Sequence, residues 1–262
     1  MSAMAQAIHI DAASAARALE AELRQSQRTV VLTGAGLSTE SGIPDFRSPG
    51  GLWSQMRPIE FDDFISSERA RQEDWRRRFE MADLFARSEP NAAHRAIAHL
   101  AADGPVTTVV TQNIDGLHRR AGTPADRLIE IHGTGDHARC LDCGLRHEIA
   151  DAERMIAETG VSPRCTRCGG LVKAAIISFG EAMPEAAMRA AQEAAAACDL
   201  LIAAGTSLVV YPAASLPLIA HEAGARIVIA SREATEQDEI ADISIRSALA
   251  ATFAPLESLE FA

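Results

Sequence analysis

Four of the five cysteines could share one metal ion, because they form two Cys-x-x-Cys pairs. The pairs, with 21 residues between them, are Cys140 with Cys143 and Cys165 with Cys168. Each pair can present two thiolates from one tight turn, and two such turns supply the four soft ligands of a tetrahedral zinc ion. Redox-active pairs and a nucleic-acid-binding zinc ribbon are the alternative interpretations. Because protein fills all four positions, the pattern predicts a structural zinc ion rather than a catalytic one.

A second group of polar side chains follows apolar, β-branched runs. Asn113 and Asp115 flank Ile114 after the run 106–111, and His132 precedes a glycine. An imidazole can accept a proton near neutral pH, and the Asx side chains could hydrogen-bond ribose hydroxyls. The structural alternatives are a histidine without a chemical role and a capped turn. Six other histidines are interpreted as bystanders: His94, His99, His118, His137, His147 and His221.

Gly34 and Gly36, on either side of Ala35, follow the run 29–33 and predict a phosphate-binding turn. Small residues let backbone amides approach phosphate oxygens, and a following helix N-terminus favours negative charge. The third glycine of the dehydrogenase fingerprint is missing, and so is an acidic end of a second strand. We therefore expect a dinucleotide that lies differently from the cofactor of an ordinary dehydrogenase.

The runs that precede these side chains predict buried parallel strands, and alanine-rich segments predict helices between them. Strands are expected at 29–33, 106–111, 174–179, 200–204 and 226–230. Helices are expected at 11–27, 185–197 and 213–223. Strands that alternate with helices form a parallel sheet covered on both faces. The predicted fold class is α/β, with a Rossmann-like, open and doubly wound parallel sheet.

Two stretches interrupt this alternation and predict a smaller module beside the sheet. Residues 50–104 are polar, arginine-rich and helical in character, and residues 136–171 hold the four paired cysteines. The predicted nucleotide-binding domain then consists of residues 1–49, 105–135 and 172–262, and the helical insert and the zinc-ribbon insert form the small domain. Because ligands bind beyond the carboxyl ends of strands in open α/β sheets, we expect the site in the cleft between the two.

Composition and charge exclude several classes of protein. The chain has 262 residues, of which 47% are hydrophobic, which suits a sizeable core and excludes a disordered protein. Neither a membrane-spanning run nor a secretory signal is recognisable, which favours the cytoplasm. Thirty-six acidic against 25 basic residues give a net charge of −11 without a basic tract. This balance argues against nucleic-acid binding and is compatible with basic peptides as partners.

Five motifs, taken together and in this order, resemble the sirtuin family of NAD-dependent protein deacylases. They are residues 34–47 (GAGLSTESGIPDFR), 112–122 (QNIDGLHRRAG), 130–133 (EIHG), 179–181 (FGE) and 205–208 (GTSL). The resemblance, to bacterial-type single-domain members, extends over essentially the whole chain. The paired cysteines fall where that family carries a structural zinc ion. The resemblance implies NAD as cosubstrate, one zinc ion per chain, and acylated-lysine proteins or peptides as partners.

The resemblance also implies a reaction and roles for individual residues. The acyl oxygen attacks the nicotinamide ribose, nicotinamide leaves, and rearrangement and hydrolysis release deacylated lysine and O-acyl-ADP-ribose. His132 is expected to be the general base that activates a ribose hydroxyl, with Asn113 orienting the ribose. Asp45 and Ile114 are expected to line the nicotinamide pocket, and Phe46 to shield the cationic sugar from water.

The remaining contacts that the resemblance implies lie around the dinucleotide and the peptide. NAD is expected to contact residues from the glycine loop to the C-terminal region: Gly34, Ala35, Gly36, Thr39, Arg47, Gln112, Asp115, Gly205, Thr206, Ser207, Ser231, Arg232, Glu233 and Leu249. The acyl-lysine peptide is expected to pair with backbone edges as an added strand. Those edges and the lysine tunnel include Ile177, Phe179, Gly180, Glu181 and Val209.

Two positions depart from the family pattern. Ser231 stands where the family usually has asparagine, so weaker contacts to the adenosine ribose are expected, with Glu233 still available. The tyrosine–arginine pair that grips acidic acyl groups is missing, because the tyrosine of this chain, Tyr211, lies in another motif. The arginines at 76–78 are expected to form a solvated helix face. We therefore predict neutral acyl groups, above all acetyl, over succinyl.

The sequence leaves two other functions open. Mono-ADP-ribosyl transfer to a protein side chain would require the same cleavage of NAD. A non-catalytic protein that binds NAD and zinc would need no base at His132. Analysis of the products separates the first function from deacylation, and substitution of His132 tests the second.

Overall fold

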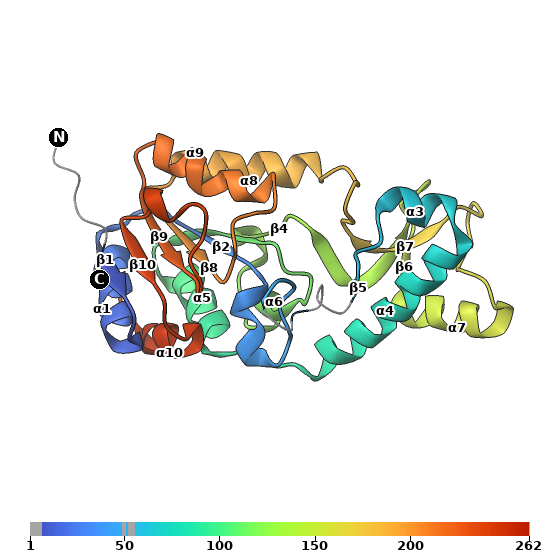
Figure 1. Ribbon diagram of the computed structural model, residues 1–262, viewed down its shortest axis with the longest axis horizontal. Coiled ribbons are helices and arrows are strands. Elements are labelled where there is room, and N and C mark those ends of the chain that lie inside the picture. Colours follow the sequence, from blue (N-terminus) through green and yellow to red (C-terminus); the bar gives the residue numbers. More distant parts are fainter. Residues whose placement is uncertain (1–6, 49–50, 52–55, 262) are drawn as a thin grey trace.

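The larger of the two parts of the protein is built on a sheet of seven parallel strands. The structure is a computed structural model that describes residues 7–48, 51 and 56–261 (Figure 1). The strand order is β1-β10-β9-β8-β2-β3-β4. The bounds are β1 Ala7–His9, β2 Thr29–Thr33, β3 Val106–Thr111, β4 Leu128–Glu130, β8 Leu200–Ala204, β9 Arg226–Ala230 and β10 Ile243–Ile245. The long β-branched runs form the central strands, where both faces are buried.

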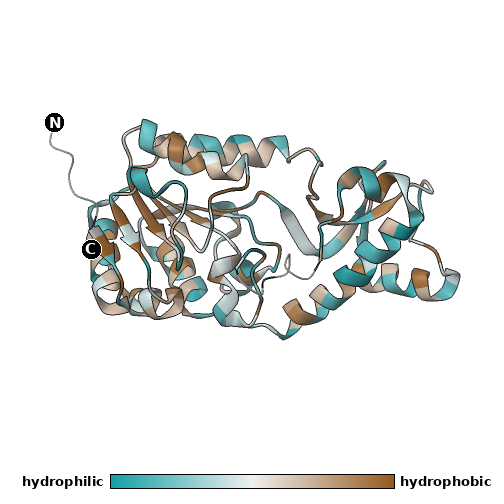
Figure 2. Ribbon diagram, in the orientation of Figure 1, coloured by the Kyte–Doolittle hydropathy of each residue, from teal (hydrophilic) through white to brown (hydrophobic). Residues whose placement is uncertain are grey.

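Helices cover both faces of this sheet, because alternate side chains of each strand point to opposite sides. Val31 belongs to a core with helices α1 (Ala12–Gln25), α5 (Ala92–Asp103) and α10 (Leu249–Phe253). Its neighbours Val30 and Leu32 belong to the opposite core, with α8 (Glu185–Ala197) and α9 (Leu216–Glu222). Figure 2 shows the hydrophobic strands enclosed between the two helical layers. The predicted α/β fold class with helices on both faces is confirmed.

A second, antiparallel sheet has the order β6-β5-β7. Its strands are β5 (Gly133–Cys140), β6 (Arg146–Glu148) and β7 (Val172–Ile176). Helices α3 (Phe61–Ser66), α4 (Glu68–Arg87) and α7 (Ile149–Thr159) lie with it at one end of the molecule (Figure 1). Trp75 of α4 is fully buried there against Ala138 and Val172. This second core is much smaller than the two cores of the parallel sheet.

The short elements complete the connections between these layers. They are the helix α6 (Leu117–Arg120) and the 3-10 helices η1 (Ala35–Leu37), η2 (Thr39–Ser41), η3 (Ala125–Arg127), η4 (Ala213–Ser215), η5 (Asp238–Ile240) and η6 (Ala254–Ser258). Within the described ranges, every helix is too short or too polar to cross a lipid bilayer.

Two expectations about the elements are wrong. The strand expected at 174–179 is β7, which spans 172–176 and pairs antiparallel with β5 in the small sheet rather than joining the parallel sheet. An apolar run predicts a buried strand but does not specify its partner. Helix α5, inside the stretch 50–104 that was assigned to the small module, instead packs on the large sheet through Ala96 and Ile97. The boundary expected between residues 49 and 50 lies outside the described residues.

Candidate active site and zinc centre

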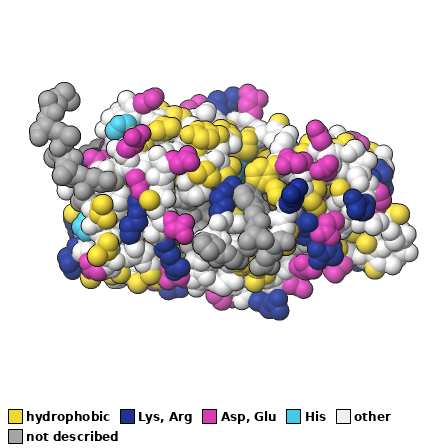
Figure 3. All heavy atoms as spheres, in the orientation of Figure 1, with side chains coloured by type: hydrophobic (Ala, Val, Ile, Leu, Met, Phe, Trp, Pro, Cys, Tyr) yellow, Lys and Arg dark blue, Asp and Glu magenta, His cyan; other side chains and the backbone are white. Residues whose placement is uncertain are grey.

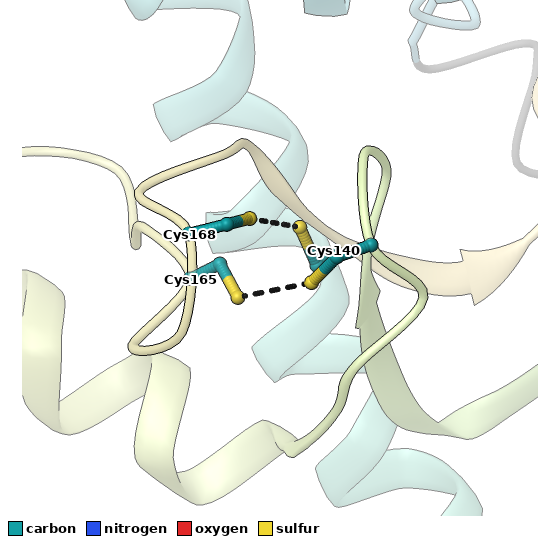
Figure 4. A group of neighbouring side chains, drawn as sticks. Cys140, Cys165 and Cys168 are labelled. Carbon is teal, nitrogen blue, oxygen red and sulfur yellow. Dashed lines mark hydrogen bonds between the residues drawn. The ribbon is translucent and has the colours of Figure 1, made fainter.

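The four paired cysteines lie together in the small module (Figure 4). Their Sγ atoms all lie within 4.8 Å of one another. The Sγ atoms of Cys140 and Cys168 are 3.5 Å apart, and those of Cys143 and Cys165 are 3.6 Å apart. Four sulfurs around a tetrahedral zinc ion, each about 2.3 Å from the metal, lie about 3.8 Å apart. Disulfide sulfurs lie only about 2.05 Å apart. The donor set therefore fits one zinc ion with four protein ligands.

Both cysteine pairs lie on turns with the same hydrogen bonds. The N–H groups of Cys140 and Cys165 each donate to the carbonyl five residues further on, at 2.9 and 2.8 Å. The N–H groups of Gly144 and Gly169 donate back to these cysteines' carbonyls, at 3.0 and 2.9 Å. Both glycines have left-handed φ angles, +69° and +75°, which glycine adopts without strain. Two equivalent turns that face each other are the arrangement predicted for a structural zinc site.

The dinucleotide loops lie where the strand order of the large sheet reverses. From β2 the chain proceeds to β3 on one side, whereas β8 lies on the other side of β2. Ligands of open α/β sheets bind beyond the carboxyl ends of the strands at such a point. The glycine loop 34–36 follows β2, residues 205–207 follow β8, and residues 112–115 follow β3. The sequence-predicted residues from three separate motifs are thus brought together at one edge.

The glycines at this edge are required by contact between the two loops. A Cβ atom on Gly34 or Gly36 would come within 2.8 Å of the carbonyl oxygen of Gly205. The N–H of Gly34 donates to Ala204 at 3.1 Å, and the N–H of Gly36 donates to Gly205 at 2.8 Å. These two amides are therefore used within the protein, contrary to the expectation that they approach phosphate oxygens. Glycine is needed at positions 34 and 36 because the two loops pack closely here, rather than because these amides bind phosphate.

His132 lies between β4, which ends at Glu130, and β5, which begins at Gly133, and its imidazole is hydrogen-bonded to a backbone carbonyl. Its Nδ1 lies 3.0 Å from the carbonyl oxygen of Gln112. Because a carbonyl only accepts hydrogen bonds, Nδ1 carries the proton and Nε2 of the neutral ring is left as a proton acceptor. Burial lowers the pKa of His132, which keeps the ring neutral, while the hydrogen bond to Gln112 opposes this shift. This arrangement leaves Nε2 able to accept a proton.

Gly133, next to His132, marks the crossing from the large sheet to the small one. Its φ angle is +75°, and a Cβ atom here would come within 2.1 Å of the carbonyl oxygen of Ala175. The N–H of Ile177 donates to the carbonyl of His132 at 2.9 Å. The residue that follows β7 therefore lies directly against the backbone of His132.

Asn113 and Asp115 are joined through Ser38 of the glycine loop. The Asn113 amide donates to the Gly34 carbonyl at 3.1 Å and to the Ser38 hydroxyl at 3.2 Å. That hydroxyl donates to Asp115 at 2.7 Å. Burial raises the pKa of Asp115, and hydrogen bonds from Leu117 N–H and Ser38 act against this shift. Sequence reasoning assigned no role to Ser38, although it lies within the motif 34–47.

Two histidines that were expected to be bystanders form a buried pair beneath this network. The rings of His94 and His118 have centroids 5.1 Å apart. Nε2 of His94 lies 3.4 Å from the Ser38 hydroxyl, and Nε2 of His118 lies 2.9 Å from the Thr33 hydroxyl. Burial lowers the pKa of His94 to about 4 and that of His118 to about 3. Both rings therefore stay neutral in the folded protein at physiological pH.

We expect this pair to make folding stability depend on pH in mildly acidic solution. An unfolded histidine has a pKa of about 6.5, so below that pH the unfolded chain binds protons that the folded chain excludes. The free energy of unfolding should fall between pH 6.5 and 5, by on the order of 4 kcal/mol for the two rings at about 1.4 kcal/mol per pKa unit. Urea unfolding at several pH values measures this loss. His118→Gln should reduce it, whereas substitution of the exposed His221 should not, and a loss unaffected by His118→Gln would contradict the assignment.

Asp45 lies in a turn that it caps itself. Its carboxylate accepts hydrogen bonds from the N–H groups of Arg47 and Ser48, at 3.1 and 2.8 Å. This local role is the Asx turn that such residues favour. Phe46 is half-buried and Arg47 is exposed in the same turn. In this turn, the Asp45 carboxylate is hydrogen-bonded to the backbone of its own segment.

The residues expected around the adenosine lie at the neighbouring end of the sheet. Ser231 follows β9, and its N–H donates to the β10 carbonyl of Ile245 at 3.0 Å. Arg232 is exposed and lies 3.9 Å from Glu40, and Glu233 is exposed beside it. Leu249 differs from the expectation, because its side chain is packed in the core with α1 and α5. Only its backbone is placed at this end of the sheet.

The expected peptide segment follows β7 and exposes apolar side chains. The carbonyl of Phe179 accepts the N–H of Phe61 at 2.8 Å, which attaches the segment to α3. The Phe179 side chain is 40% exposed, and that of Val209, after β8, is 38% exposed. Ile177 between them is half-buried. Hydrophobic side chains gather near the middle of the face drawn in Figure 3, where the two parts of the molecule meet.

Fold and site together define a Rossmann-like α/β protein with a second, smaller module that contains a four-cysteine metal site. The Sir2 family matches residues 34–212, more than half of the chain. A curated relative, the NAD-dependent protein deacetylase of Rhodopseudomonas palustris, is 53% identical over 226 residues, which cover 86% of this chain and 89% of the relative. The NAD-dependent protein deacylase 2 of Archaeoglobus fulgidus is 45% identical over 227 residues, 85% of this chain and 87% of that protein.

Solved structures agree with these relatives. A Sir2 protein with a p53 peptide and NAD+ matches at a TM-score of 0.81 and 36% identity, over 92% of this chain and 96% of that one. A Sir2 protein bound to a propionylated peptide matches at 0.82 and 35% identity, with the same coverage. The chain belongs to the Sir2 (sirtuin) family.

Proposed function

We propose that this protein is an NAD-dependent protein lysine deacylase that releases nicotinamide and O-acyl-ADP-ribose. The observation that carries the proposal is the placement of His132, whose Nε2 is left as a proton acceptor beside the loop of Asn113. The names of the curated relatives support the NAD dependence. The Sir2 structures with NAD+ and a propionylated peptide support an acyl-lysine substrate.

In the proposed reaction, the acyl oxygen of the modified lysine forms a bond to C1′ of the nicotinamide ribose. The bond from C1′ to nicotinamide breaks, and nicotinamide leaves with the electron pair. His132 then takes a proton from a ribose hydroxyl, whose oxygen attacks the acyl carbon. The bond from the acyl carbon to the lysine nitrogen breaks as the amine takes up a proton. Water adds to the acyl carbon and the bond to the original acyl oxygen breaks, which leaves that oxygen on C1′ and the acyl group on the ribose hydroxyl oxygen. Asn113 holds the ribose and the attacking groups, and Ser38 with Asp115 holds Asn113. Proton transfer of this kind contributes about 10²–10⁴-fold to a rate.

The dinucleotide would lie over the edge where the strand order reverses. Its nicotinamide end faces Asp45, Phe46 and Ile114, and its adenosine end faces Ser231 and Glu233. The contacts between these ends come from residues on three loops and the C-terminal region, beside the close-packed turn of Gly34 and Gly36: Ala35, Thr39, Arg47, Gln112, Asp115, Gly205, Thr206, Ser207, Arg232 and the backbone of Leu249. The acyl-lysine peptide would pair as an added strand with the segments of Ile177–Glu181 and Val209.

The proposed activity is tested by incubating the protein with NAD and an acetyl-lysine peptide. We expect nicotinamide, deacetylated peptide and O-acetyl-ADP-ribose in equal amounts by mass spectrometry. ADP-ribosylated protein without deacetylated peptide would support mono-ADP-ribosyl transfer instead. Calorimetry with NAD at millimolar concentration tests whether Ser231 still permits dinucleotide binding. Binding of NAD without any product would favour a non-catalytic role.

We expect acetyl-lysine to be a better substrate than succinyl-lysine. The arginines of α4 that could meet an acyl carboxylate are engaged with neighbouring acids: Arg76 with Glu73 and Glu80, Arg77 with Glu73, and Arg78 with Asp74. An uncompensated carboxylate in an apolar tunnel costs several kcal/mol, so kcat/KM should favour acetyl by about tenfold or more. Paired peptides that differ only in the acyl group measure this ratio, and faster turnover of the succinyl peptide would overturn it.

We place the protein in the cytoplasm, since its cysteines fit a metal site and are free of disulfides. Thiolate ligands of this kind persist where thiols are kept reduced.

A further inference from the structure

Lys173 is the only lysine of the chain, and it is buried. Its side chain is 1% exposed, and its Nζ donates to a carboxylate oxygen of Glu181 at 2.8 Å and to the Ile176 carbonyl at 2.6 Å. Burial lowers the pKa of Lys173, and the Glu181 carboxylate opposes this shift. A buried ammonium persists only when it is paired and hydrogen-bonded, as this one is.

The Glu181 carboxylate accepts hydrogen bonds both from Lys173 and from the backbone of residues 177–181, which form a turn after β7. The same oxygen that meets Lys173 accepts the N–H of Ser178 at 3.0 Å, and the other oxygen accepts Arg139 at 3.2 Å. The N–H of Glu181 donates to the Ser178 carbonyl at 3.1 Å. The side chain of Glu181 is only 7% exposed, so these bonds lie largely away from water.

This turn carries the backbone that the proposed function assigns to the peptide. Ile177 is bonded to the carbonyl of His132, and Phe179 is bonded to the first residue of α3, Phe61. The Lys173–Glu181 pair adds a buried side-chain contact that joins β7 to the turn that contains these two attachments. Such a pair is weak evidence for stability, because desolvation of the two charges offsets much of their attraction. A buried pair of this kind can instead fix the conformation of the segment that it joins.

We propose that Lys173 and Glu181 are positioning residues for the acyl-lysine peptide. They hold residues 177–181 in the turn after β7, where Gly180 has a φ angle of +78°, before substrate arrives, so that little ordering of this peptide edge is needed on binding. Neither side chain contacts the reacting atoms. This inference rests on the proposed function, because it takes the segment 177–181 as the peptide edge.

The test compares Lys173→Met and Lys173→Arg with the wild-type protein. In Lys173→Met, KM for the acetyl-lysine peptide should rise by about tenfold or more, while kcat at saturating peptide and the Kd for NAD stay within about twofold. Lys173→Arg keeps the cation and its donors and should restore most of the affinity. Arg226→Met is the matched control. It removes the cation of another ion pair, Arg226–Glu22, at the first residue of β9, and it should leave KM unchanged.

Three outcomes separate the inference from the proposed function. A wild-type protein that neither binds nor deacylates the peptide overturns both. An active wild-type protein with an unchanged KM in Lys173→Met overturns the inference alone. A parallel loss of kcat, NAD affinity and thermal stability in Lys173→Met also overturns it, since that pattern indicates a purely structural role.

A measurement on the wild-type protein remains decisive if Lys173→Met does not fold. Because the chain contains one lysine, an amine-acetylating reagent modifies a single side chain, which mass spectrometry of a digest resolves from the N-terminal amine. We expect Lys173 to react in urea and to be protected in the folded protein. Saturating acetyl-lysine peptide should slow its modification further, by about threefold or more, because strand pairing restrains the segment that covers it. An unchanged rate with bound peptide would overturn the inference.

Discussion

Replacing His132 by alanine is expected to lower the rate of deacetylated-peptide formation by about 10²–10⁴-fold. The reason is that Nε2 of the neutral ring is the proton acceptor that the Gln112 carbonyl leaves available. The substitution removes this base without altering the glycine loops or the zinc centre. Single-turnover analysis of the peptide by mass spectrometry, at saturating NAD, measures the loss.

His221 supplies the matched control for this substitution. It is exposed at the end of α9, and His221→Ala should leave turnover within about twofold of wild type, as is usual for surface changes. The His132→Ala protein should still bind NAD and hold zinc. Undiminished deacetylation by His132→Ala would remove His132 from the mechanism and favour another base. The rate of the wild-type protein should also fall on the acid side of a pKa below 6.5, the usual histidine value.

Loss of one zinc ligand is expected to unfold the small module. Cys165→Ala removes a buried ligand, and structural zinc contributes apparent binding free energies of about 10–16 kcal/mol in small domains. The module's own core, built around Trp75 and Val172, is too small to compensate. We expect the zinc content to fall from one ion per chain to none. Deacylation should be lost with it, because β7 leads directly into the peptide segment.

Cys198→Ala is the control for the zinc experiment. Cys198 lies buried at the end of α8, away from the four-cysteine cluster, where it behaves as the small core side chain that its setting favours. Metal analysis of Cys198→Ala should still give one zinc ion per chain, with full activity. A Cys165→Ala protein that keeps its zinc and its activity would contradict the structural role.

The central strands could be predicted from sequence because each carries a long β-branched or aliphatic run. The strands expected at 29–33, 106–111, 200–204 and 226–230 and the helix expected at 185–197 have the predicted bounds. The three-residue strands β1, β6 and β10 were not predicted, since so few residues give no measurable alternation. The pairing of β7 and the docking of α5 depend on contacts between distant segments, which local patterns do not encode.

The same distinction applies to the site. Spacing alone predicted the four-cysteine cluster, because two Cys-x-x-Cys pairs have a chemical reason to meet. Residue types alone left His132 and Asn113 open to structural interpretations, and only the resemblance to the sirtuin motifs implied their roles. The partners of these residues were not predictable. The Gln112 contact is made by a backbone carbonyl, and the pairing of His94 with His118 joins α5 to α6. Only the folded chain brings such groups within hydrogen-bonding distance.

The crossing at Gly133 has a mechanical consequence. The two chain segments that join the large sheet to the small one here, one entering β5 and one leaving β7, run beside His132. Since a Cβ atom at position 133 would collide with Ala175, this joint has a fixed spacing. We expect any rotation of the small module about this crossing to displace residues 177–181 more than His132, because His132 is next to the crossing.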